Sequence, residues 1–135
     1  MEPARPPILI AAEEYQFLDT VYGSTPATVQ EWQVANNLER LRELAALSPL
    51  AIVVDLEAAC FSHTDVLNLL GSMRISAPIV LLAGPDIDKR EQAKQVASSL
   101  SLNVAGTLRR PLIMTALLRL LKSHAAAPST ATAQD

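Results

Sequence analysis

A doubly wound α/β domain with five parallel strands is the fold that this sequence predicts. Short runs of branched apolar residues alternate with longer segments of helical spacing, which is typical of a parallel sheet covered by helices. Half of the 135 residues are hydrophobic and only 4% are aromatic, as expected for a core of aliphatic side chains. The third observation is Asp55, which closes the apolar run 50–54. Open α/β sheets carry their functional groups at such strand ends.

Five segments are expected to form the strands. Pro6 and Pro7 end a short leader, residues 1–7, and the apolar segment 8–12 follows as a buried strand. Residues 28–34 have a mixed pattern, which predicts a strand near an edge of the sheet. The other strands are expected over residues 50–55, 79–82 and 103–108.

Capping residues and breakers predict the helices between these strands. A short helical stretch is expected before the breaker at residues 23–26. Asn37 is the expected N-cap of the next helix, and Thr64 or Asp65 that of the one after it. The last two helices are expected over residues 86–100 and 111–121. Together these elements form a doubly wound sheet of the flavodoxin-like type.

The chain is expected to form one domain, residues 8–123, followed by a disordered tail. Residues 124–135 are rich in Ala, Ser and Thr and have low complexity. The apolar runs are too short to span a bilayer, and the first residues do not resemble a signal peptide, so a cytoplasmic location is predicted.

Composition also excludes several classes of function. A net charge of −3 argues against a nucleic-acid binder, which normally has a basic face. The single Cys60 forms no disulfide within the chain, and no cysteine–histidine pattern indicates zinc. The four glycines form no phosphate-binding loop, and no serine lies in a G-x-S-x-G elbow. We therefore expect no enzymatic activity and no catalytic residues.

Charged side chains follow several of the predicted strands. Glu13 and Glu14 come after the first, Asp55 ends the third, and Arg109 and Arg110 follow the fifth. Acids from two strands could hold Mg²⁺, which prefers oxygen ligands. Arg110 could then pair with the oxygens of a phosphoryl group. The alternative is that these side chains are solvated loop residues.

Residues 8–122 resemble the receiver domain of bacterial two-component response regulators. The resemblance rests on Val53-Val54-Asp55-Leu56, on the strand at residues 78–84 and on Arg110-Pro111. It implies that Asp55 is the phospho-acceptor, that Arg110 replaces the lysine of the family, and that the peptide bond before Pro111 is cis. It also implies Mg²⁺ as cofactor and a histidine kinase or another signalling protein as partner.

Several positions depart from the pattern of this family. Ala83 stands where the family has Ser or Thr, and Thr107 stands at the aromatic position of the last strand. Alignment of the first strand gives Ala12 and Glu13 as the acidic pair, or Glu13 and Glu14 after a slip of one residue. Glu57, two residues after Asp55, could repel a phosphoryl group, add a metal ligand or be solvated. Both halves of the usual switch, the hydroxyl and the aromatic, are therefore missing.

Three hypotheses remain open from the sequence. The first is a degenerate receiver that acts by protein–protein contact, with a possible homodimer through its last strand and helices. The second is a working receiver phosphorylated on Asp55 by a histidine kinase. The third is a nucleotide or small-molecule sensor that uses Arg109 and Arg110 as anion ligands.

Overall fold

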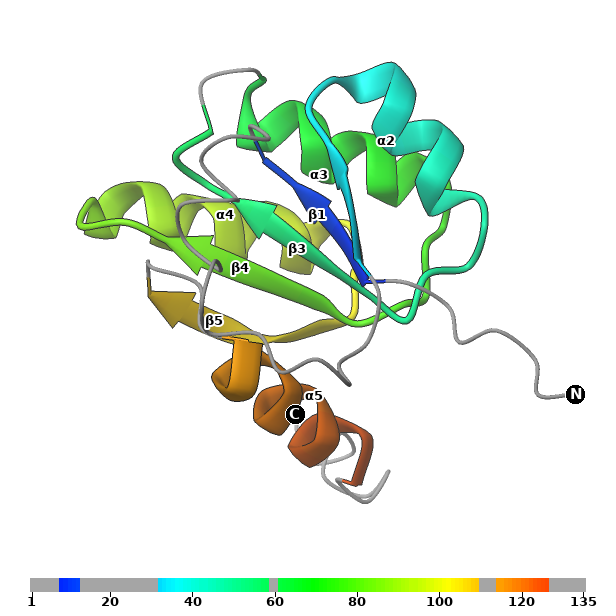
Figure 1. The fold of residues 1–135 in the computed structure, drawn as a ribbon. Helices are drawn as coiled ribbons and strands as arrows, with labels where there is room; N and C mark the ends of the chain where they lie inside the picture. The colour runs from blue at the N-terminus through cyan, green and yellow to red at the C-terminus, as the bar shows by residue number, and fades with distance from the viewer. Residues whose placement is uncertain (1–7, 13–31, 59–60, 110–113, 127–135) are drawn as a thin grey trace, which may run out of the picture.

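The computed structural model describes residues 8–12, 32–58, 61–109 and 114–126. These residues form a five-stranded, all-parallel sheet in the order β2-β1-β3-β4-β5, which confirms the predicted fold class (Figure 1). The strands are β1 (Ile8–Ala11), β2 (Trp32–Ala35), β3 (Ala51–Asp55), β4 (Ile79–Ala83) and β5 (Val104–Arg109). The position of β2 at one edge is also as predicted.

The two faces of the sheet are covered by different helices (Figure 1). Three helices, α2 (Leu38–Ala45), α3 (His63–Ser72) and α4 (Ile87–Ser99), pack on one face, and α5 (Met114–Ala126) packs on the other. Strand side chains alternate between the two cores because successive residues of a strand point to opposite faces. Ile52 and Val54 thus lie in the core beneath α2, α3 and α4, and Val53 lies in the core beneath α5.

The central strands owe their burial to covering on both faces. Every residue of β1, β3 and β4 is buried, as is typical of strands in a parallel sheet between two helical layers. On the α5 side, Leu117 is fully buried and Leu120 packs closely on Gly106 of β5. A Cβ atom at Gly106 would stand 3.1 Å from the Leu120 methyl carbons, so glycine allows the close approach of α5.

The helices α2, α3 and α4 each begin after a residue whose side chain caps the helix, and the predicted cap of α3 needs correction. The Asn37 side chain accepts a hydrogen bond from the Arg40 N–H at 2.7 Å, and Asp86 caps α4 through the Lys89 N–H at 3.1 Å. The predicted caps of α3, Thr64 and Asp65, are wrong. Ser62 caps this helix instead, because its hydroxyl accepts from the Thr64 N–H at 3.1 Å and thereby includes His63 in the first turn.

Some element boundaries differ from the prediction. Strand β2 ends at Ala35, one residue past the expected 34, and α5 continues past Leu121 to Ala126. The helix expected before the breaker at 23–26, the leader, and residues 127–135 of the expected tail lie outside the described residues. Among the helices that the structure describes, none is long and apolar enough to cross a membrane.

Two helices end with a residue in the left-handed backbone conformation. Arg74 follows α3 with φ of 55°, and Ser101 follows α4 with φ of 59°. At the end of α4, the Leu102 N–H donates to the Ala97 carbonyl and the Ser101 N–H donates to the Ser98 carbonyl. This is the Schellman arrangement, in which glycine is the preferred residue because it has no Cβ to strain.

Replacing Ser101 with glycine is therefore expected to stabilise the fold. Ser101→Gly removes the cost of a left-handed non-glycine residue and should raise the unfolding free energy by about 1 kcal/mol in urea denaturation. The matched control is Ser98→Gly, within α4, which should lower it by roughly 0.5–1 kcal/mol. A loss of stability in Ser101→Gly would show that the left-handed serine carries no such cost.

Candidate functional site

Asp55 lies at the carboxyl end of the central strand β3 and is only 3% exposed. A buried carboxylate requires hydrogen-bond donors, and the Glu57 N–H donates to Asp55 Oδ1 at 3.0 Å. This is the local turn that aspartate favours, in which its side chain accepts from the backbone two residues on. The next residue, Leu56, still pairs with β4, since its N–H donates to the Leu82 carbonyl at 3.0 Å. The carboxylate is thus held at a rigid strand end.

The neighbouring strand β4 ends in two small residues. In the register of the sheet, Asp55 pairs with Leu82, so Ala83 and Gly84 are the next two residues at the same edge. Ala83 is 1% exposed and offers a methyl group there. A Cβ atom added at Gly84 would stand 2.8 Å from Glu57 Cγ and from Glu57 Oε2. The Glu57 side chain therefore packs directly on Gly84, and a Cβ atom there would displace it from its present position.

Glu57 connects the end of β3 with the start of α4. Its Oε1 pairs with Lys89 Nζ at 3.3 Å, while its backbone N–H binds Asp55. Lys89 lies in the first turn of α4, where a cation is disfavoured by the helix dipole and a carboxylate is favoured. The Glu57 carboxylate compensates the lysine at this position. Its other oxygen, Oε2, is buried and has no hydrogen-bond partner among the described residues.

His63 completes this group of charged and titratable side chains. It begins α3 and is half-buried. Burial lowers the pKa of His63 from its ordinary value of 6.5; Lys89 lowers it further, and the Glu57 carboxylate opposes both effects. Its Nε2 is buried without a hydrogen-bond partner among the described residues. The neutral imidazole is therefore the favoured form next to the Glu57–Lys89 pair.

The other predicted site residues are only partly described. Thr107 pairs with Leu81, and Arg109 pairs with Ala83 and is exposed at the end of β5. The remaining candidates lie outside the described residues: Glu13, Glu14, Arg110 and Pro111. The acidic pair, the role of the arginine and the cis peptide bond therefore stay predictions.

The described residues do not by themselves form a magnesium site. Mg²⁺ requires several oxygen ligands in near-octahedral geometry. Within ranges 8–12, 32–58, 61–109 and 114–126, no group of three His, Cys, Asp or Glu residues could hold a metal ion. Asp55 is the strand-end carboxylate of this part of the chain, and Glu57 is engaged with Lys89. The role of Glu57 as a metal ligand stays a prediction, because the other predicted ligands, Glu13 and Glu14, lie outside the described residues.

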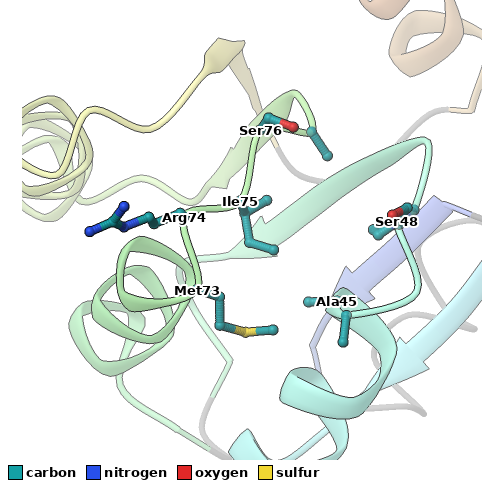
Figure 2. A pocket seen from close by; sticks show the side chains of 9 residues that line it. Ala45, Ser48, Met73, Arg74, Ile75 and Ser76 are labelled. Carbon is teal, nitrogen blue, oxygen red and sulfur yellow. The ribbon is translucent and has the colours of Figure 1, made fainter.

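A hollow of about 400 Å³ lies at the opposite end of the sheet (Figure 2). It is lined by the residues that follow α2 and α3, among them Ser48, Ile75 and Ser76. Arg74 borders it, but its side chain extends away from the hollow (Figure 2). Ligand sites normally combine apolar walls with converging polar groups. The strand ends around Asp55 bring such groups together, and we regard them as the functional site.

The sequence patterns indicate Asp55 but do not indicate Lys89. They give Glu57 only a weak role, and they give His63 none, because Cys60 is the single cysteine near it and no second histidine is near it in sequence. A signal is nevertheless present, because lysine in the first turn of a predicted helix opposes the helix dipole. Such a lysine indicates a carboxylate partner from another element.

Comparisons with known proteins support the fold. No protein-family model and no curated protein sequence matches the chain. Among solved structures, it is similar to a response regulator from Burkholderia pseudomallei with a phosphorylated aspartic acid, a calcium ion and citrate. That match has 21% identity and a TM-score of 0.66, over 96% of this chain and 72% of the other.

Two further structures have the same architecture. The receiver domain of a response regulator from Bermanella marisrubri matches with 17% identity and a TM-score of 0.65, over 90% of this chain and 98% of the other. FixJ-N matches with 16% identity and a TM-score of 0.66, over 92% of this chain and 94% of the other. The chain therefore has the fold of receiver domains.

The protonation of His63 should be coupled to folding. Because folding lowers its pKa, the unfolded chain binds a proton more readily than the folded protein does. Neutral His63 contributes fully to the free energy of unfolding above pH 6.5. This contribution is lost as the pH falls below 6.5, so the free energy of unfolding should decline in that range. Urea denaturation over a pH series measures this decline, and His63→Gln should make it shallower.

The same titration tests the charge arrangement around His63. In a His124→Gln background, which leaves one histidine in the chain, NMR should give a higher pKa for His63 in Lys89→Gln and a lower one in Glu57→Gln. Identical titration curves in all three proteins would show that these side chains do not face one another.

Proposed function

We propose that this protein is an atypical receiver module that acts in bacterial signal transduction through protein–protein contact rather than through phosphorylation of Asp55. The observation that carries the proposal is the end of β4, where Ala83 follows Leu82, the strand partner of Asp55, and has only a buried methyl group. In the receiver family, a hydroxyl at this position binds the phosphoryl group. The Ala83 side chain has no hydroxyl and can donate no hydrogen bond to a phosphoryl group on Asp55.

The other half of the family switch is absent as well. Thr107 lies opposite Leu81 on β5, at the position where the family has an aromatic residue. A bound group shifts a conformational equilibrium only when it interacts differently with the two states. Without the hydroxyl and the aromatic, the usual contact between the strand end and the β5 surface is missing. This supports a module whose interaction surface is permanently formed.

The proposed interaction surface includes α4, β5 and α5. Ile87, at the start of α4, is 61% exposed, and an exposed aliphatic side chain of this size suits a protein contact. In α5, by contrast, Leu117 is fully buried against the sheet. The partner is a histidine kinase or another signalling protein, or a second copy of the chain. We assign the protein no enzymatic activity and a cytoplasmic location.

A phosphorylatable receiver is the second candidate, and Asp55 itself favours it. Its carboxylate lies at the strand end in a turn held by the Glu57 N–H, and the similar Burkholderia protein contains a phosphorylated aspartic acid. This candidate requires Glu13, Glu14 and Arg110 to supply a metal site and a cation. The nucleotide-sensor hypothesis would rely on Arg109 and Arg110, of which the structure describes Arg109.

Incubation with phosphoramidate and magnesium chloride distinguishes the two candidates. Phosphorylation would join an Asp55 carboxylate oxygen to phosphorus as the P–N bond breaks and ammonia leaves. We expect intact-mass spectrometry to detect no such adduct, whereas the Burkholderia response regulator, treated in parallel, should acquire it. An adduct that disappears in Asp55→Asn would replace this proposal with the second candidate.

A further inference from the structure

The corner between β3, β4 and α4 contains an ion pair that the proposed function does not explain. Glu57 reaches from the end of β3 across Gly84 of β4 and binds Lys89 of α4 at 3.3 Å. Its backbone N–H binds Asp55 at 3.0 Å. A single residue thus contacts Asp55 through its backbone and covers the neighbouring strand end with its carboxylate.

The Glu57 carboxylate lies against Gly84, two residues after the strand partner of Asp55, at the edge where an anion held by Asp55 and β4 would be placed. An anion bound between Asp55 and the end of β4 lies beside Gly84, and Glu57 Oε2 packs against that glycine. The Glu57 carboxylate and an anion in its neighbourhood repel each other, and the repulsion is stronger where water is partly excluded. The side chain of Glu57 therefore acts against a small oxyanion both by its charge and by its volume.

Lys89 is the cation that an oxyanion at this corner would use. It lies in the first turn of α4, whose backbone N–H groups also favour negative charge. In the present arrangement its charge is neutralised by Glu57. The second carboxylate oxygen of Glu57 has no partner among the described residues, so the carboxylate is only half satisfied and can be displaced by a better ligand of Lys89.

We propose that Glu57 excludes small oxyanions from the Asp55 site and masks Lys89 as their ligand, so that displacement of Glu57 opens the site to an oxyanion of phosphoryl size. The inference rests on the proposed function, because it explains why the wild-type site does not take up a phosphoryl group. Glu57 is the specificity-determining residue, and Lys89 is the anion ligand that its removal exposes.

Beryllofluoride, a mimic of the phosphoryl group, tests the inference in NMR titrations of the full chain with magnesium chloride present. Glu57→Gln should bind it roughly tenfold more tightly than wild type, which corresponds to about 1.4 kcal/mol. In the Glu57→Gln background, Lys89→Gln should abolish this gain and Asp55→Asn should remove binding. The matched controls are Glu43→Gln and Lys94→Gln, which break exposed ion pairs elsewhere and should leave the affinity at the wild-type value.

Gly84→Ala provides a second test that keeps every charge. Its Cβ would require the end of the Glu57 side chain to move, so this variant should also gain affinity, but less than Glu57→Gln. Equal weak binding by wild type, Glu57→Gln and Gly84→Ala would overturn the inference and leave the proposed function standing. Binding by wild type as tight as that of Glu57→Gln would overturn the inference, and phosphorylation by phosphoramidate would separately overturn the proposed function.

Discussion

The parallel pairing of β3 with β4 holds this site together. The register places Asp55 beside Leu82, and the Leu56 N–H continues the pairing one residue past the end of β3. Asp55 is therefore fixed within a buried strand rather than in a mobile loop, and Ala83 and Gly84 follow at the same edge. Both strands are covered on both faces, so this alignment is stabilised by the whole core.

Asp55 organises the turn that the chain makes directly after β3. The Asp55 carboxylate accepts the Glu57 N–H, and the Asp55 carbonyl accepts the Ala58 N–H at 3.2 Å. These bonds turn the chain so that the Glu57 side chain lies across Gly84. Glycine at this position leaves room for Glu57, because a Cβ atom there would force the Glu57 side chain to move. A backbone interaction of one acid thus sets the direction of a second acid.

The chemistry of this edge is decided by a few side chains on a widely used scaffold. The same fold occurs in a response regulator with a phosphorylated aspartic acid at 21% identity, and fold alone does not determine function. In this chain β4 ends in Ala83, and Glu57, whose N–H binds the strand-end aspartate, forms an ion pair with Lys89.

The order of the elements, the five-stranded parallel sheet and the position of Asp55 could all be predicted from the sequence. These features follow from local periodicity, capping residues and continuous apolar runs, each of which is visible within a few neighbouring residues. The N-cap Asn37 is an example, whereas the predicted start of α3 was wrong because Ser, Thr and Asp can all cap a helix.

The side chains that meet at the end of the sheet could be identified only in three dimensions. Glu57 and Lys89 are separated by 32 positions in sequence, and neither has a pattern that names its partner. Their contact depends on the packing of α4 beside β4 and on the space left by Gly84. Long-range contacts of this kind follow from the spatial arrangement of the elements, which local sequence preferences do not contain.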